Sequence, residues 1–248
     1  MLLLEIGGDY CCAALLNHNE KSFHYIRYIT YEEFEAEKSL VSFLEELNGS
    51  YERVVVASAF SQSLLVPEEF RNHPALLSAI YDIPQQKKFA DDIFERQMNV
   101  AWSIPASLFH LITEKFSAAQ FLHVYTPVLK TDNGFVEEDQ IDIHFSTKHF
   151  RILVKKDRKI QLVQTYSYKT PLDVVYFLLK ICYEFGLQQW EVVIIISGFI
   201  DEDSALYDEL HNYFLNLHFA NAPAFSVPES TCPHHYFTSL YNLAECVS

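Results

Sequence analysis

The chain has 248 residues and a formal net charge of −15, from 33 acidic and 18 basic residues. This charge repels phosphate backbones, and no apolar run approaches the roughly 20 residues that span a bilayer. The five cysteines, an odd number with Cys11 and Cys12 adjacent, do not suit a disulfide framework and predict free thiols. We therefore expect a cytoplasmic protein without a nucleic-acid or membrane partner.

The first part of the chain, residues 1–66, predicts a meander followed by a helix and a buried strand. Apolar runs over residues 2–6, 10–16 and 22–29 are separated by turn compositions, which is typical of antiparallel strands. A helix is predicted over residues 32–47, and "RVVVASAF" reads as a strand covered on both faces. The predicted buried face of the helix consists of Phe34, Val41, Leu44 and Leu47.

Residues 67–136 are predicted to be an insertion into the first half or an extension of it. "KFADDIFERQMNVAWSI" suggests a pair of strands, residues 105–116 an amphipathic helix, and residues 120–125 another strand. The turn-rich "KTDNG" at residues 130–134 is the expected domain boundary.

Residues 137–221 repeat the pattern of the first half. Strands are predicted over residues 140–145, 149–155 and 159–167, followed by a helix that opens at Thr170 and Pro171 and ends at Gly186. One apolar stripe is expected on this helix, formed by Leu172, Val175, Tyr176, Leu179, Cys182 and Tyr183. A buried strand, "EVVIIISGF", and a closing helix over residues 204–217 follow.

Residues 222–248 predict a tail whose short helix packs back on the first half. The residues expected to face one way are Phe237, Leu240, Tyr241 and Ala244.

The two halves align at a constant shift of 139 positions, as from Ser58 to Ser197. At this shift "LLLEIGG" lies over "IDIHFST", "YCCAALL" over "HFRILVK", and "ERVVVASAF" over "EVVIIISGF", all without a gap. Three strand-like segments in one register indicate an internal duplication.

Three strands, a helix, a strand and a helix, present twice, resemble the duplicated ribonuclease H-like fold of the actin-like ATPase superfamily. That superfamily includes sugar and acetate kinases and heat-shock ATPases. The chain is similar, more narrowly, to an uncharacterised bacterial family with this fold. The resemblance implies an α/β protein with two ribonuclease H-like halves, a middle insertion and a nucleotide cleft.

The resemblance also implies where ATP and Mg²⁺ would bind if the chain holds a nucleotide. The first phosphate loop matches Glu5, Gly7, Gly8 and Asp9. The residues that correspond to the second phosphate loop and the adenosine loop are Asp142, Ser146, Thr147, Ser197 and Gly198, with Asp142 two residues before the expected position of the acid.

These loops depart from the pattern of the superfamily. Glu5 replaces the usual Asp, His144 lies where the second acid is expected, and no lysine or arginine is expected near either loop. We therefore predict a non-catalytic protein with a degenerate nucleotide cleft, without a cofactor, that acts through a protein partner. The aromatic stretches "FHYIRYITY" and "YSYKT" suit a binding surface or ordinary cross-strand packing. The alternative is an ATP-binding kinase or ATPase.

A metal-dependent nuclease is a second alternative, because single-copy ribonuclease H enzymes gather acids around two metals. The candidate acids are Glu5 with Glu45, or Asp142 with Asp173, Asp201 and Asp203. Acids in the first turn of a helix also interact favourably with its dipole, which is the favoured interpretation here. Cys232, His234 and His235 have metal-ligand residue types but lack a second pair at zinc spacing, so no metal site is predicted.

Overall fold

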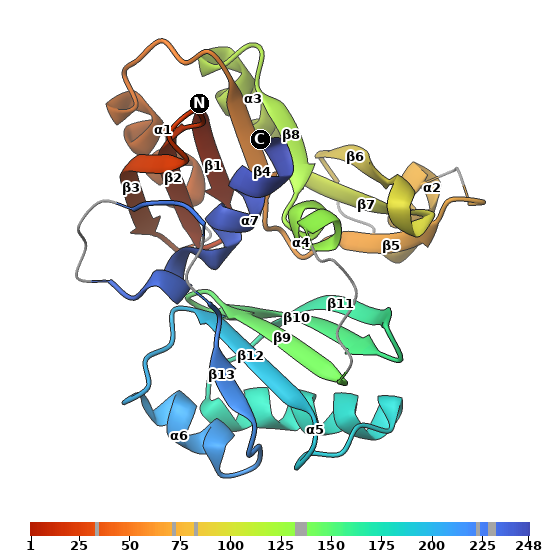
Figure 1. Cartoon of the computed structure of the whole chain (residues 1–248). Helices are drawn as coiled ribbons and strands as arrows, with labels where there is room; N and C mark the ends of the chain where they lie inside the picture. Colours follow the sequence, from red (N-terminus) through yellow and green to blue (C-terminus); the bar gives the residue numbers. More distant parts are fainter. Residues whose placement is uncertain (33–34, 71–72, 82–83, 132–137, 222–223, 228–231) are drawn as a thin grey trace. The chain divides into compact units, whose positions relative to one another are not determined.

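The computed structural model describes the chain except for residues 33–34, 71–72, 82–83, 132–137, 222–223 and 228–231 (Figure 1). The chain forms two compact units. The first comprises Met1–Asp132, Ala224–Glu229 and Leu240–Ser248, and the second comprises Asn133–Pro223 and Ser230–Ser239. Within the described ranges, none of the helices has the length and apolar character needed to cross a bilayer.

The first unit is built on a five-stranded sheet of order β3-β2-β1-β4-β8. Its strands are β1 (Leu2–Ile6), β2 (Tyr10–Asn17), β3 (Ser22–Thr30), β4 (Val54–Ser58) and β8 (Gln120–His123). Strand β1 is antiparallel to β2 and parallel to β4. Both β1 and β4 are buried along their whole length, which the apolar sequence of β4 predicted.

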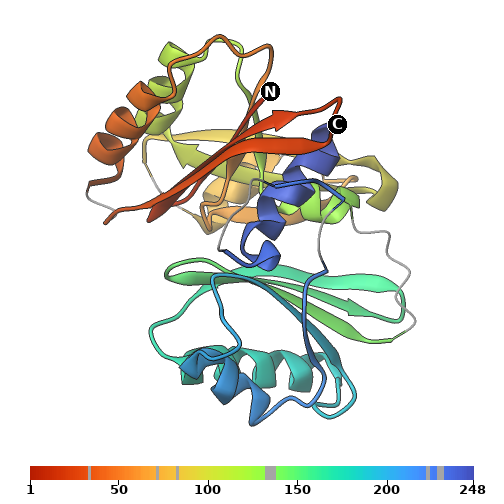
Figure 2. The same cartoon turned by 60° about the vertical axis from the view of Figure 1, so that its left-hand side comes forward.

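Helices α1 (Ala36–Glu46) and α3 (Ala106–Lys115) lie side by side in this unit (Figure 2). The predicted start of α1 was residue 32, and the predicted face residue Phe34 lies outside the described residues. Val41 was predicted to be buried and is exposed. The buried face consists of Ala36, Leu40, Phe43 and Leu44, because Val41 lies about 100° around the helix from its neighbour Leu40.

Residues between β4 and β8 form a second, three-stranded sheet of order β5-β7-β6. Its elements are β5 (Ser63–Pro67), α2 (His73–Ile80), β6 (Gln86–Ile93) and β7 (Met98–Pro105). The predicted strand pair is confirmed by β6 and β7, whereas β5 and α2 were not predicted. The chain then enters α3, β8 and α4 (Tyr125–Thr131), so part of residues 67–136 completes the first sheet.

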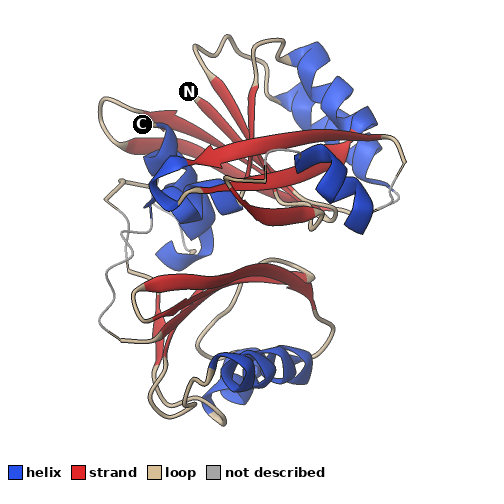
Figure 3. Cartoon of the chain, turned by 90° about the vertical axis from the view of Figure 1, so that its right-hand side faces the viewer, coloured by secondary structure: helices blue, strands red, loops and turns tan. Residues whose placement is uncertain are grey.

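The second unit repeats the strand order of the first, as β11-β10-β9-β12-β13. Its strands are β9 (Gln140–Phe145), β10 (His149–Lys156), β11 (Lys159–Ser167), β12 (Val193–Gly198) and β13 (Leu217–Phe219). Helices α5 (Pro171–Phe185) and α6 (Ala205–His211) gather on one side of this sheet (Figure 3). Helix α6 ends before its predicted limit because Leu217 pairs with Ile194 as a strand residue.

Helix α5 has the predicted capping residues at both ends. The Thr170 side chain accepts from the Asp173 N–H in a capping box, and Gly186 ends the helix at φ 62°. The apolar stripe predicted for α5 is only partly buried, because Val175 and Cys182 belong to the core and the other predicted residues lie toward solvent. The buried face consists of Val174, Val175, Leu178, Ile181 and Cys182, whereas Leu172, Tyr176 and Tyr183 are exposed.

The strand register supports the duplication and corrects part of the alignment. Glu5 lies opposite Cys12 and His144 opposite Arg151, as the constant shift requires. The fourth strands do not follow this shift. Val54 on β4 pairs with Leu2, so the shift predicts that Val193 pairs with Ile141, but it is Ile194 on β12 that does so. The fourth strand is therefore displaced by one residue between the halves, because the connections that precede it differ in length. Gly198, not Ser197, is the counterpart of Ser58.

The tail contributes to the first unit through helix α7 (Thr238–Val247). The Tyr241 ring lies 5.6 Å from the Phe23 ring, and Arg53 Nη1 donates to Val247 O at 2.6 Å. Leu240, Tyr241 and Ala244 are buried. These three residues of the predicted apolar face therefore face the protein interior, whereas Phe237, the fourth, precedes the helix and is half-buried.

Candidate functional site

The predicted first phosphate loop is a tight turn between β1 and β2. The Gly7 N–H donates to Tyr10 O at 2.9 Å and closes the hairpin. The Tyr31 hydroxyl donates to Gly7 O at 2.9 Å and to Tyr10 O at 2.7 Å. Burial raises the pKa of Tyr31, so the hydroxyl stays protonated and available as a donor. The backbone of this turn is thus fixed by the protein itself.

Glu5, the acid of this loop, is bound by its own neighbour. Its side chain is 4% exposed, and Oε1 accepts a hydrogen bond of 2.5 Å from the Tyr10 hydroxyl. Burial, and then the charge of Glu5, raise the pKa of the thiols of Cys11 and Cys12. Both cysteines are therefore protonated at neutral pH and do not act as nucleophiles.

The two glycines of the turn differ in what they contact. A Cβ on Gly7 would lie 2.7 Å from Tyr10 Cε1, whereas a Cβ on Gly8 would meet nothing closer than Phe60 Cε1 at 3.9 Å. The aromatic ring on β2 therefore accounts for glycine at position 7. The structure shows no such steric reason for Gly8.

The predicted second phosphate loop is built in the same way. The Ser146 N–H and hydroxyl both donate to His149 O, at 2.8 and 3.0 Å. The Tyr168 hydroxyl donates to Ser146 O at 3.4 Å, which reproduces the contact of Tyr31 with the first turn. Thr147 is exposed at the tip of the hairpin. The hydroxyl that would be expected to face a phosphate, that of Ser146, is engaged within the turn.

The predicted adenosine-loop residues Ser197 and Gly198 are the last two residues of β12. The Ser197 hydroxyl donates to Ile143 O at 3.2 Å, so it accepts from His144 Nδ1, which lies 3.0 Å away. Gly198 has φ +80°, and a Cβ there would lie 2.0 Å from Phe145 O. The close approach of two strands therefore explains Gly198 without a ligand.

The expectation that no cation lies near these loops was wrong for the second unit. Lys155 Nζ lies 2.8 Å from Asp142 Oδ2, and Arg151 pairs with His144 across β9 and β10. Both basic residues are 8% exposed. Arg151 was missed because it follows the turn and returns beside it by pairing with His144, whereas Lys155 lies opposite Gln140 at the other end of β9 and reaches Asp142 but not the turn.

The environment of His144 predicts a dependence of stability on pH. Burial, then the charges of Arg151 and His235, hold the pKa of His144 well below its usual value of 6.5. The unfolded chain therefore binds this proton more readily, so the free energy of unfolding falls as pH drops below 6.5. We expect a slope of up to about 1.4 kcal/mol per pH unit, measured by urea denaturation from pH 7.5 to 5.5. His144→Gln, which keeps a donor for Ser197, should flatten this slope, and an unchanged slope would contradict the assignment.

Three residues with catalytic side chains meet at the end of the first sheet and were not singled out from the sequence. Ser58 pairs with His123 across β4 and β8, and Asp91 on β6 accepts from the His123 N–H at 2.7 Å. Their geometry does not form a catalytic triad. His123 Nδ1 accepts from the Tyr125 N–H, so Nε2 carries the proton and faces Phe60 O at 3.0 Å.

Asp91 instead holds the small sheet onto the first sheet. Besides the His123 N–H, its carboxylate accepts from Trp102 Nε1 at 2.9 Å and from the Thr126 hydroxyl at 2.6 Å. Burial nevertheless raises the pKa of Asp91. The period of β6 is the signal that could have found it, because Asp91 alternates with the exposed Ala90 and Asp92.

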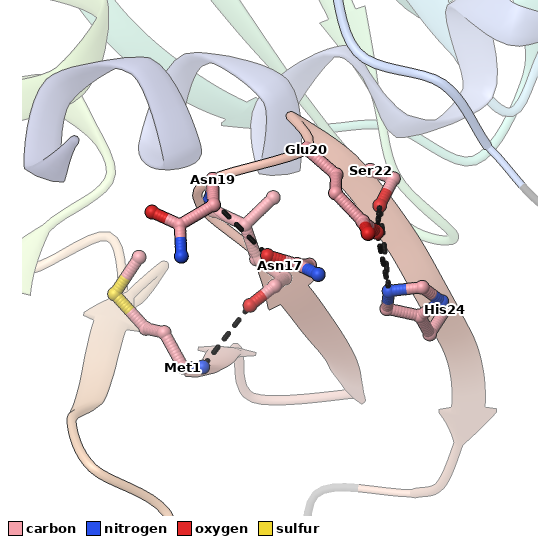
Figure 4. A network of polar contacts seen from close by, with 7 residues as sticks. Met1, Asn17, Asn19, Glu20, Ser22 and His24 are labelled. Carbon is pink, nitrogen blue, oxygen red and sulfur yellow. Dashed lines mark hydrogen bonds and ion pairs between the residues drawn. The ribbon is translucent and has the colours of Figure 1, made fainter.

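An open cavity of about 920 Å³ lies beside the end of β2 in the first unit. Figure 4 shows polar contacts made by four of its lining residues, Met1, Asn17, Asn19 and His24. The Asn19 N–H donates to Asn17 Oδ1 at 3.1 Å, and His24 Nε2 lies 3.6 Å from Glu20 Oε2. None of the residues predicted to bind a nucleotide lines it.

Most of the acids considered for a nuclease are engaged in other contacts. Asp173 caps α5, Asp142 pairs with Lys155, and Glu45 is exposed. Asp201 accepts from the Tyr236 hydroxyl at 2.5 Å. In the described part of the chain, no three His, Cys, Asp or Glu residues are grouped as metal ligands. His235, one of the tail residues with a metal-ligand side chain, has Nε2 2.8 Å from Ile200 O.

Comparisons with known proteins agree with this fold. A family model described as "Protein of unknown function (DUF3822)" matches residues 1–217. A solved protein of Bacteroides thetaiotaomicron with actin-like ATPase fold and unknown function is 14% identical, with a TM-score of 0.83 over 99% of this chain and 95% of that chain. No curated protein matches the sequence.

Two further solved structures share the fold. One is the PilM-PilN type IV pilus biogenesis complex, at 12% identity and a TM-score of 0.66 over 100% of this chain and 98% of that chain. The other is the cytoplasmic domain of EpsL, an inner membrane component of the type II secretion system of Vibrio cholerae. It is 11% identical, with a TM-score of 0.50 over 100% of this chain and 94% of that chain. The chain thus has the actin-like ATPase fold that its duplicated pattern predicted.

Proposed function

The chain belongs to the DUF3822 family of proteins of unknown function, and we propose that it is a non-catalytic member of the actin-like fold that acts by binding another protein. The engagement of Glu5 carries this proposal. Its carboxylate is the acid expected to hold Mg²⁺, yet it is buried and accepts a 2.5 Å hydrogen bond from Tyr10. Phosphoryl transfer needs such an acid to be directed at the metal and the phosphates.

The remaining predicted site residues do not fit ATP and Mg²⁺ better. Ser146 and Ser197 donate their hydroxyls to backbone carbonyls of their own unit. His144 replaces the second acid, and its depressed pKa leaves it neutral at pH 7. No catalytic step is therefore assigned to a bound nucleotide.

The neighbours in structure support the protein-binding part of this proposal. PilM was solved in a complex with PilN, and EpsL is described as a component of a secretion system. A fold shared at this low identity does not transfer a partner, but it shows that proteins of this fold occur in protein assemblies. Exposed apolar side chains in both units, such as Phe94 and Leu215, suit such a role.

An ATP-binding protein is the second candidate, and Arg151 is the observation that favours it. This buried arginine lies on β10 near the second turn, with Ser239 Oγ 3.3 Å from Nη2. A guanidinium is well suited to binding a phosphate. Under this alternative, Arg151 supplies the positive charge that the sequence did not predict near the turn.

A thermal-shift titration with ATP and ADP, each with and without Mg²⁺, distinguishes the two candidates. A ligand at 100 times its dissociation constant stabilises the folded state by about 2.7 kcal/mol, which gives a clear rise in melting temperature. Because Glu5 is engaged by Tyr10, we expect no rise at millimolar nucleotide.

Two variants sharpen this titration. Tyr10→Phe removes the hydroxyl that donates to Glu5, and it should still give no nucleotide-dependent shift because the Ser146 and Ser197 hydroxyls stay engaged and His144 still replaces the second acid. A shift in the unmodified protein that Arg151→Gln abolishes would favour the ATP-binding candidate and rule out the proposal.

A further inference from the structure

The first helix of each half occupies the same place in the duplicated fold, yet the two helices present different surfaces. On α1 the exposed positions are polar except for Val41, which is 36% exposed. On α5, Leu172, Tyr176 and Tyr183 are 57%, 61% and 85% exposed. Since the fold is the same in both halves, it does not require this exposed apolar surface on α5.

The exposed residues of α5 have the spacing of a helix-packing seam. With the half-buried Leu179, they occupy positions i, i+4, i+7 and i+11 of the helix. These positions fall within a narrow stripe at about 100° per residue, which is the pattern that packs against another helix. The capping box at Thr170 and the Gly186 cap hold the helix that carries this stripe.

We propose that α5 packs antiparallel against α5 of a second copy of this chain, across a two-fold axis. Antiparallel pairing places Leu172 against Tyr183 of the second copy, and Tyr176 against Leu179 of the second copy. Each aromatic ring then meets an aliphatic side chain, whereas parallel pairing would oppose leucine to leucine and tyrosine to tyrosine. A two-fold interface requires a self-complementary surface of this kind.

Charged residues beside the stripe favour the same arrangement. Asp173 and Lys180 lie on one flank of the stripe, because they are seven residues apart on the helix. A two-fold axis near the middle of α5 brings Lys180 close to Asp173 of the second copy. In a parallel pair, the two-fold axis would place this flank of each helix on opposite sides of the interface, so Asp173 and Lys180 of the two copies would not meet.

The whole-chain charge opposes this association and predicts how salt affects it. Each copy carries a net charge of −15, so two copies repel one another at long range. Added salt screens that repulsion, and the dimer should therefore strengthen with ionic strength. The dimer does not depend on the proposed function, because either a nucleotide-binding or a non-catalytic protein could form it.

Sedimentation equilibrium of the full chain over a range of concentrations tests the proposal. We expect a reversible monomer–dimer equilibrium, weakened at least tenfold by Tyr176→Glu. The matched control is Val41→Glu on α1, which places the same charge on the equivalent helix and should leave the equilibrium unchanged. A monomer at every concentration, or a dimer that Tyr176→Glu leaves intact, would overturn it.

Thiol cross-linking tests the orientation of the helices. In a background of Cys232→Ser and Cys246→Ser, Tyr176→Cys lies close to the two-fold axis and should give a covalent dimer with a short bis-maleimide. Tyr183→Cys lies far from the axis and should not, whereas the double variant Leu172→Cys, Tyr183→Cys should. A covalent dimer from Tyr183→Cys alone would show parallel helices and overturn the pairing.

Discussion

Gly198→Ala is expected to lower the free energy of unfolding of the second unit by about 4 kcal/mol. The new Cβ would lie 2.0 Å from Phe145 O and 2.7 Å from Phe145 N, at a backbone φ of +80°. These are backbone atoms of β9, so no side chain can rotate to make room. The two strands would have to separate at the point where the Phe199 N–H donates to Phe145 O. Urea denaturation followed by circular dichroism measures the loss.

The turn of the first unit supplies matched controls for this substitution. Gly8→Ala places a methyl group 3.9 Å from its nearest neighbour, and we expect a change of no more than about 0.5 kcal/mol. Gly7→Ala should fall between the two, because the contact at 2.7 Å is with the Tyr10 ring, which can shift. A Gly198→Ala protein as stable as Gly8→Ala would contradict the close strand approach at Phe145.

Most strands of the two five-stranded sheets could be predicted because their signals are local, although β13 was not. Alternating or continuous apolar runs bounded by turn residues identified β1, β9 and β11 with the observed limits. The duplicated order of these elements then led to the fold. The one-residue displacement of β12 relative to β4 could not be predicted from these local patterns. It depends on how the strands pair, and runs of Val and Ile look alike in either register.

The faces of α5 show a second limit of sequence patterns. Leu172 and Tyr176 are as apolar as the buried Val175, so composition does not distinguish the face that meets the sheet from the face that meets solvent. Only the position of the helix over β9 and β12 decides it. The same exposed residues become informative once the structure separates them from the core, because α1 lacks them.

The residues of the candidate loops could be predicted from the sequence, whereas the residues that contact them from other strands could not. Glu5 and Gly7 lie in one turn, as their adjacency in sequence requires. Arg151 and Asp91 reach their sites from other strands, and sequence distance hides such contacts. Glu5 and Asp91 illustrate the difference. Glu5 binds Tyr10, which is five residues away in the sequence, whereas Asp91 binds the backbone of His123, which is 32 residues away.

Asp91→Ala should therefore have the largest effect on the first unit, a loss of about 3 kcal/mol in its free energy of unfolding. The substitution leaves three donors without their acceptor: Trp102 Nε1, the His123 N–H and the Thr126 hydroxyl. Burial raises the pKa of Asp91, which shows that burying the charged carboxylate is unfavourable. Part of the stabilisation from the three hydrogen bonds offsets this cost. The expected loss is accordingly smaller than three separate charged hydrogen bonds would give.

Tryptophan fluorescence can follow this contact directly. Trp102 is fully buried and Trp190 is 59% exposed, so a Trp190→Phe background leaves the indole that binds Asp91 as the only one. In this background, Asp91→Ala should shift the Trp102 emission to the red and lower the unfolding midpoint in urea, because the β5-β7-β6 sheet loses its attachment to β8. Asp92→Ala, at the neighbouring exposed position, should change the stability by no more than about 0.5 kcal/mol. Equal effects of the two substitutions would mean that the small sheet is held to β8 by its apolar packing alone.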